Sequence, residues 1–168
     1  MLGTKLYKGQ YTNKDYADLA VWCNANNATI EDKGDYYECV ALPEPSLEDL
    51  KAEKVAEMKV ERDRIQELPI EYNGKSFDYN KESLQKLNEA KDCLEGTGDI
   101  QIWICADNSL TYLNYNDIMA IKRLGKERSN NVHIQYAKLK YLIEIAKTAE
   151  EVDAITFETD TSDIPLEV

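Results

Sequence analysis

The sequence predicts an α+β fold in which small antiparallel hairpins pack on helices and two modules are joined by a long helix. Three observations support this prediction. Residues 46–68 carry helix-forming residues throughout and are bounded by prolines on both sides. Residues 69–79 switch to a period of two around an Asn-Gly pair, which is a strong local indicator of a β-hairpin. The chain of 168 residues is long enough for one medium domain or two small ones.

The composition argues against several classes of partner. The formal net charge is −12. Binding to a phosphate backbone or to an anionic membrane surface needs clustered Lys and Arg, so we expect neither nucleic acid nor a membrane as a partner. Residues 1–10 contain no long apolar run, and we therefore expect no signal peptide.

The cysteines and the single histidine predict no metal centre. The four cysteines are Cys23, Cys39, Cys93 and Cys105, and no CxxC pair occurs among them. His133 is far from all of them in sequence, so the spacing of metal ligands is missing. We expect no metal and no cofactor. In a reduced cytosolic setting the thiols are predicted to act as small buried hydrophobic groups.

The first predicted module covers residues 1–44. Its first eleven residues are expected to form an extended arm. Thr12 and Asp15 have the spacing of a capping box, which predicts a helix that continues to about Asn24. Two β-rich runs around a glycine-containing turn then predict a hairpin. A module of this size is too small to be comfortably stable alone, so we expect it to pack on the rest of the chain or on a partner.

Adjacent tyrosines make this module a candidate interaction surface. Tyr36 and Tyr37 lie next to each other on the second predicted strand, so their side chains point to opposite faces. One of the two is therefore expected to be exposed unless both faces are covered. Tyrosine favours interfaces because it buries a large area and keeps a polar tip. By contrast, we expect Phe77 and Trp103 to fill a core.

Residues 45–68 are predicted to form the connecting helix. Ser46 is a good N-cap, and Pro69 disfavours helical geometry in the residue before it. The apolar stripe is narrow and is interrupted at Arg62, so we interpret the helix as a spacer between the modules. Two alternatives remain: an ordinary surface helix, or a helix that self-associates and gives a homo-oligomer. The candidate interaction residues of the stripe are Val55, Met58 and Ile65.

Residues 69–155 are predicted to form a hairpin–helix–hairpin–long helix domain. The Asn-Gly pair of the first hairpin accepts positive φ at both central positions of a type I′ turn. A helix over residues 81–94 follows. Residues 100–106 and 110–114 predict a second hairpin, which could join the first in one small sheet. The long last helix has a glycine at 125, where we expect a kink or break.

Residues 156–168 are predicted to form an acidic tail. From residue 148 onward the chain carries seven acidic residues and no Lys or Arg. Such a segment is typical of a mobile or partner-dependent tail.

No catalytic motif occurs in the chain. The nucleophile elbow, the phosphate-binding loop, the dinucleotide-binding glycine pattern and the zinc-protease motif are all missing from the sequence. His133 has neither an orienting carboxylate nor a nucleophile that can be placed beside it. The acidic residues are scattered, so no pair for general acid–base chemistry can be singled out. We therefore name no catalytic residue and expect a protein that is not an enzyme.

Four segments in the second half of the chain are PIEYNGKSFDY at residues 69–79, the helix predicted over residues 81–94, IWICADN at 102–108 and TAEE at 148–151. Together they resemble an uncharacterised domain family common in bacteriophage and prophage tail gene clusters. The family pattern is a Y-N-G-x-x-F-D hairpin, a helix, a W-x-x-A-D hairpin and a long C-terminal helix. The resemblance covers roughly residues 69–155. The family has no established activity, so it implies no functional residue.

The resemblance implies that the gene for this chain lies beside genes for tail fibres, baseplates and their assembly factors. Our leading hypothesis is a non-enzymatic, tail-associated structural protein of the tail tip, baseplate or fibre region, with other phage tail or fibre proteins as partners. The alternative is a tail-fibre assembly chaperone that is not retained in the particle, and a third hypothesis is an enzyme that acts on cell-surface polymer. The expected location is the virion tail, or the bacterial host cytoplasm during assembly.

Overall fold

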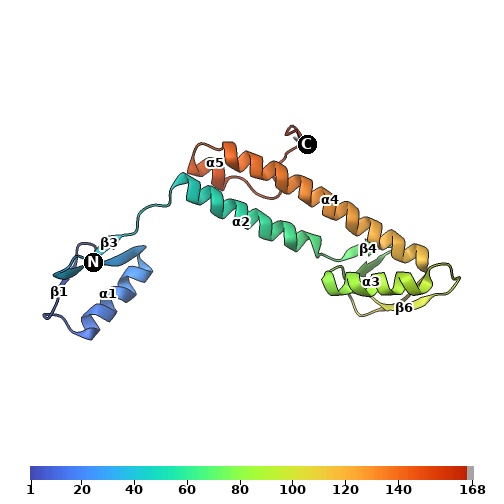
Figure 1. Ribbon diagram of the computed structural model, residues 1–168, viewed down its shortest axis with the longest axis horizontal. Helices are drawn as coiled ribbons and strands as arrows, with labels where there is room; N and C mark the ends of the chain where they lie inside the picture. The colour runs from blue at the N-terminus through green and yellow to red at the C-terminus, as the bar shows by residue number, and fades with distance from the viewer. Residues whose placement is uncertain (166–168) are drawn as a thin grey trace. The chain divides into compact units, whose positions relative to one another are not determined.

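A computed structural model describes residues 1–165 and shows the predicted α+β fold. About half of the chain is helical and about one sixth is in strands. The chain divides into two compact units, Met1–Ser46 and a second unit that begins at Leu47 (Figure 1).

The first unit is a three-stranded antiparallel sheet with one helix. Strands β1 (Lys5–Tyr7), β2 (Ala28–Asp32) and β3 (Tyr36–Ala41) are arranged in the order β1-β3-β2. Helix α1 (Asn13–Ala25) packs on this sheet. The expectation of an extended arm was wrong for β1, because β3 offers a second edge to which β1 binds. That pairing joins residues about thirty positions apart, which no local pattern encodes.

The start of α1 confirms the predicted capping box. The Thr12 side chain accepts a hydrogen bond from the Asp15 N–H, and the Asp15 carboxylate accepts one from the Thr12 N–H at 2.8 Å. Behind α1 lies the small core of the unit. Its fully buried members are Leu19, Cys23, Ala28 and Cys39, with Leu6, Trp22 and Ile30 packed around them.

The second unit is built on two helices that lie side by side. Helices α2 (Leu47–Gln66) and α4 (Tyr115–Ile145) run in opposite directions, and α5 (Ala149–Asp153) packs on α2 (Figure 1). Together with residues that follow α5, these helices enclose one hydrophobic core. The buried members of this core are Met58, Val132, Leu139, Ile143, Ile155 and Phe157.

The expectation that α2 is a spacer was wrong. Met58 is 2% exposed, and Val55 and Ile65 pack against the same core. The stripe is narrow because it is buried mainly against one helix, and the sequence cannot tell an intrachain partner from another molecule. The interruption of the stripe also has a cause: the Arg62 guanidinium lies 4.8 Å from the centre of the Tyr136 ring and covers that ring.

Helix α4 continues for 31 residues through the glycine where we expected a break. The expected break was inferred from the low helix propensity of glycine and of the Ser-Asn-Asn run that follows it. Packing along both α2 and α3 overrides this weak local preference. Its N-terminus carries a second capping box, formed by Asn114 and Asp117.

The two hairpins and α3 pack against the N-terminal part of α4. Strands β4 (Ile70–Tyr72) and β5 (Lys75–Phe77) form the predicted hairpin, and Asn73 and Gly74 have φ of 49° and 72°. Helix α3 runs over Lys81–Leu94, as predicted. The buried residues of this second core are Ile70, Phe77, Leu87, Ala90, Leu94, Cys105, Leu113, Ile118 and Ile121.

The second hairpin consists of β6 (Gln101–Ile104) and β7 (Leu110–Leu113). It remains a two-stranded sheet separate from β4–β5, so the anticipated single sheet does not form. The two hairpins are linked instead by a hydrogen bond from the Ala106 N–H to the Ser76 carbonyl oxygen at 2.8 Å.

The described part of the predicted acidic tail is anchored, contrary to expectation. Gln135 of α4 donates through Nε2 to the carbonyl oxygens of Phe157 and Thr159 at 3.1 and 2.8 Å. Thr161 is buried and donates through Oγ1 to Gln135 Oε1 at 2.6 Å, and Lys138 donates to the Thr161 carbonyl oxygen. The acidic charge of this segment favoured a mobile tail, but Phe157 is buried in the α2–α4 core and holds the segment against it. Residues 166–168, the last part of that predicted tail, lie outside the described residues.

Within residues 1–165, no helix is both long enough and apolar enough to cross a membrane.

Candidate interaction surface

One face of the β6–β7 hairpin is apolar and exposed. In the antiparallel register Ile102 lies opposite Tyr112 and Ile104 lies opposite Leu110. These four side chains project to the same side of the sheet, because opposite residues in a ladder share a face, and Ile100 extends the row. Each of the five is 61–65% exposed. We call these five residues the hairpin face.

The opposite side of the same hairpin fixes its orientation. Cys105 and Leu113 are buried in the core beneath α3 and α4, and Trp103 is half-buried against that core. A slip of one residue in register would exchange the two sides and expose Cys105 and Leu113 instead. The hairpin face therefore stays exposed, although it is made of residue types that are normally buried.

A hollow of about 590 Å³ borders the hairpin face between β6 and α3. Ile102 and Ile104 line it from the strand, and Lys86, Glu89 and Cys93 line it from the helix. In the described residues β6 pairs with β7 on one edge only. An exposed strand edge beside a helix is the geometry that accepts an extended segment of a partner.

The predicted tyrosines lie in the first unit and face opposite sides of its sheet. The Tyr36 ring is 5.4 Å from the Tyr7 ring, and the Lys5 ammonium lies 4.6 Å from the Tyr36 ring centre. Both rings sit on the side of the sheet away from the α1 core. Tyr36 is half-buried because β1 supplies these neighbours, which the sequence did not anticipate.

Tyr37 lies at the α1 side of the sheet. Its ring is 6.0 Å from the Tyr11 ring and 5.3 Å from the Tyr16 ring, and both contacts are edge-on. The Lys8 ammonium lies 4.9 Å from the centre of the Tyr37 ring. Tyr37 is therefore also half-buried by residues of its own unit. Both faces of the strand are therefore covered at this pair, which is the condition under which we expected neither tyrosine to be exposed.

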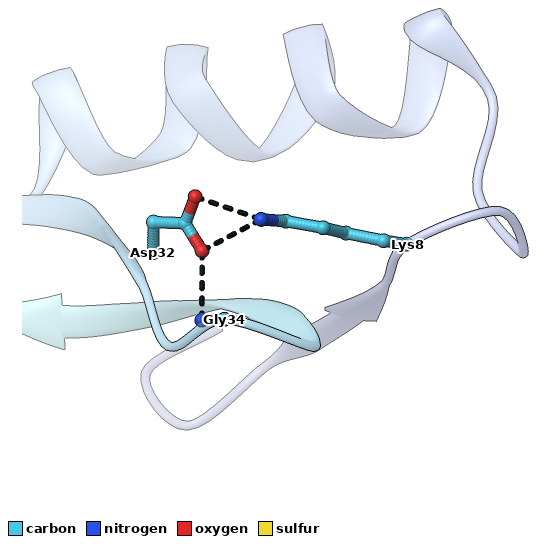
Figure 2. Close-up of polar contacts among 3 residues, drawn as sticks. All are labelled: Lys8, Asp32 and Gly34. Atoms are coloured by element: carbon cyan, nitrogen blue, oxygen red, sulfur yellow. Dashed lines mark hydrogen bonds and ion pairs between the residues drawn. The ribbon is translucent and has the colours of Figure 1, made fainter.

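An ion pair ties the end of β1 to the turn between β2 and β3. Figure 2 shows Lys8 Nζ donating to both carboxylate oxygens of Asp32, at 2.9 and 2.8 Å. The Gly34 N–H donates to Asp32 Oδ1 at 2.8 Å. The ammonium of Lys8, followed by the Gly34 N–H, holds the pKa of Asp32 below its ordinary value of 3.8. The same contact raises the pKa of Lys8.

We expect Asp32→Asn to destabilise the first unit at neutral pH and to have a smaller effect at pH 2. Because the folded-state pKa of Asp32 is lowered, its contribution is present above the unfolded pKa of about 3.8 and is lost as the pH falls through the folded value. Urea unfolding followed by Trp22 fluorescence in a Trp103→Phe background measures this unit. Asp18→Asn, an equal charge change at an exposed site of α1, is the control. An equal penalty for Asp32→Asn at both pH values would contradict the prediction.

The sequence-predicted interaction residues are divided between the two units. Tyr36 and Tyr37 belong to the sheet of the first unit, whereas Val55, Met58 and Ile65 belong to the α2–α4 core of the second. The three residues of α2 are therefore not available as a free self-association stripe. Sequence analysis missed the hairpin face, although the alternation within residues 100–106 contained it. The other side of that strand carries Trp103 and Cys105, which are also apolar, so the pattern did not say which side faces the core.

The second unit thus defines a class of small α+β domain: an antiparallel helix pair that carries two hairpins and a third helix. Residues 49–156 match the family described as "Domain of unknown function (DUF4376)", and the chain belongs to this family. The matched segment contains the hairpin face and most of the second unit, and the first unit lies before it. No curated protein and no solved structure matches the chain.

Proposed function

We propose that this chain is a non-enzymatic phage or prophage tail-associated structural protein that works through protein–protein contacts of the hairpin face. The observation that carries the proposal is the row of five large apolar side chains, each more than three-fifths exposed. A single exposed apolar residue is ordinary, but a contiguous patch of them favours a partner. Burying each side chain would contribute roughly 1–2 kcal/mol to association. The tail tip, baseplate or fibre location follows from the resemblance of the two hairpin motifs.

The non-enzymatic part of the proposal is supported by the electrostatics of the described residues. Shifted pKa values gather at active sites when burial and close charges act together. Here the lowered carboxyl pKa values arise from helix caps, turns and surface ion pairs. For example, Thr12 lowers the pKa of Asp15, and Lys86 lowers the pKa of Glu82. These are structural uses of charge, and none of them lies in a closed cleft.

We expect the protein to be present in purified phage particles. We expect it to be absent from the particles when lysine substitutions place charge on the hairpin face. The test is the variant Ile102→Lys with Leu110→Lys, analysed by mass spectrometry of particles from the strain that encodes the chain. The control, Val21→Lys with Val60→Lys, adds the same charge at two apolar residues that are 68% and 69% exposed. Far-UV circular dichroism verifies that both variants fold.

Each outcome of this experiment decides one part of the proposal. Particles that lack the unmodified protein would overturn the structural role. If the hairpin-face variant is retained as well as the control, the contacts are made elsewhere on the chain.

A second candidate function is a tail-fibre assembly chaperone that leaves before the particle is complete. The observation that favours it is the combination of an apolar hairpin face with a formal net charge of −12. Such a protein can cover a sticky surface while its charge keeps the complex in solution. Co-expression with the neighbouring fibre gene tests this role. Unchanged fibre solubility and trimerisation without this chain would reject it.

A further inference from the structure

Two thiols meet in the core of the first unit. Cys23 of α1 and Cys39 of β3 are 2% and 1% exposed, and both are free. Their sulfur atoms lie 3.1 Å apart. A disulfide holds its sulfur atoms about 2.05 Å apart. An approach of about one ångström therefore separates this thiol pair from a covalent bond between the helix and the central strand.

The core around these thiols is small. Four residues of the first unit form its buried cluster, and two of them are Cys23 and Cys39. Leu19 is the only large aliphatic side chain among the four. Natural domains in this size range commonly depend on disulfides, metals or partner chains, because their cores bury too little apolar area. A covalent link here would supply stability that the core lacks.

We propose that Cys23 and Cys39 form a redox-modification site, at which a disulfide-class oxidant such as oxidised glutathione converts the pair into an intramolecular disulfide that joins α1 to β3. The thiolate of one cysteine attacks the disulfide of the oxidant and releases one thiol. The second cysteine then attacks the resulting mixed disulfide and releases the other thiol. In total, the protein loses two hydrogen atoms and the oxidant is reduced to two thiols.

Burial decides when this reaction occurs. Removal from water raises the pKa of the Cys39 thiol, and contact with Cys23 raises it further, so little thiolate is present in the closed unit. An oxidant also cannot reach a pair that is 1–2% exposed. The bond therefore forms as the unit opens or folds, and its rate should increase in mild denaturant. Once formed, it is protected from reductants by the same burial.

The two other cysteines provide internal controls. Cys93 is exposed on α3, and Cys105 is buried in the core of the second unit. Cys93 should react readily with glutathione and obscure the measurement, so the test uses the full chain with Cys93→Ser. Adding Cys105→Ser to this background leaves the proposed pair intact. Adding Cys23→Ala removes the pair without placing a hydroxyl group in the core.

The experiment oxidises each variant in a glutathione buffer that contains mild urea. Trypsin cleavage after Lys33 separates Cys23 from Cys39, so a disulfide appears as two linked peptides in a non-reducing digest. We expect the linked pair to dominate with Cys93→Ser and with Cys93→Ser/Cys105→Ser. In a Trp103→Phe background, the Tm of the first unit, followed by Trp22 fluorescence, should rise by roughly 10 °C or more on oxidation. With Cys23→Ala, oxidation should leave the Tm unchanged.

A digest that contains only free thiols or glutathione adducts at Cys23 and Cys39 after oxidation in the glutathione buffer would overturn the proposal. A linked pair without any increase in Tm would confirm the modification site and overturn its stabilising role.

Discussion

Met58→Ala is expected to lower the free energy of unfolding of the second unit by about 2–5 kcal/mol. Met58 is 2% exposed and lies in the core between α2 and α4. Alanine removes three heavy atoms from that core and leaves a cavity, because two packed helices cannot fully close around the gap. The loss is a large part of the total stability of an ordinary domain.

The matched control for this substitution lies two residues away on the same helix. Val60 is 69% exposed, so Val60→Ala should change the free energy of unfolding by less than about 0.5 kcal/mol. Urea unfolding followed by far-UV circular dichroism measures both variants, and sedimentation reports their association. If α2 were only a spacer, Met58→Ala would leave the stability of the second unit unchanged, and if α2 were a self-association helix, the variant would associate more weakly at unchanged stability. Either result would refute the packing described here.

Gly125→Ala is expected to destabilise the second unit, by a net amount of about 1–2 kcal/mol. The Tyr79 ring lies directly against Gly125 of α4, and a methyl group at this position would occupy the space of that ring. Alanine itself favours a helix over glycine by about 1 kcal/mol. The packing penalty is therefore expected to exceed the gain in helix propensity, and the difference between the two is the net loss of stability.

The position of the Tyr79 ring explains why its displacement is costly. Its hydroxyl donates to the Lys122 carbonyl oxygen at 3.3 Å, and the Arg128 guanidinium lies 5.4 Å from the ring centre. Arg128 in turn donates to the carbonyl oxygens of Gln66 and Pro69, at 2.7 and 3.0 Å. A cation at the C-terminal end of α2 is favoured by the helix dipole. Displacing the ring therefore loosens the contact between the end of α2 and α4.

A double-mutant cycle separates the two effects at this glycine. In a Tyr79→Ala background the space is free, so Gly125→Ala should become stabilising by about 0.5–1 kcal/mol. The expected reversal of sign is measured by urea unfolding of the four variants. Destabilisation of equal size in both backgrounds would show that the glycine is needed for a reason other than the ring.

Elements whose cause is local were predictable from the sequence. The capping box of Thr12 and Asp15 and the Asn-Gly turn of the first hairpin each depend on a few adjacent residues, and both are confirmed. The bounds of α3 were equally well predicted, because Asn80 caps its start and Gly96, with φ of 76°, follows its end.

The candidate surface was harder to predict, because burial is decided by which side of an element meets a neighbour. Both sides of the strand over residues 100–106 carry large apolar residues, the isoleucines on one side and Trp103 on the other, so alternation alone could not assign the isoleucines to the exposed side. For the stripe of α2 the error was in the opposite direction. The stripe was interpreted as a candidate surface for another molecule, but α4 of the same chain covers it.

The sequence by itself determined the α+β class, the helices with their caps and the hairpins with their turns. These features follow from backbone dihedral preferences and hydrogen bonds between residues a few positions apart. The tertiary structure alone decided that β1 pairs with β3, that α2 is a core helix, that Gly125 makes room for Tyr79 and that the hairpin face is exposed. Each of these depends on contacts between residues distant in the chain, and the side-chain period of one element does not specify its partner.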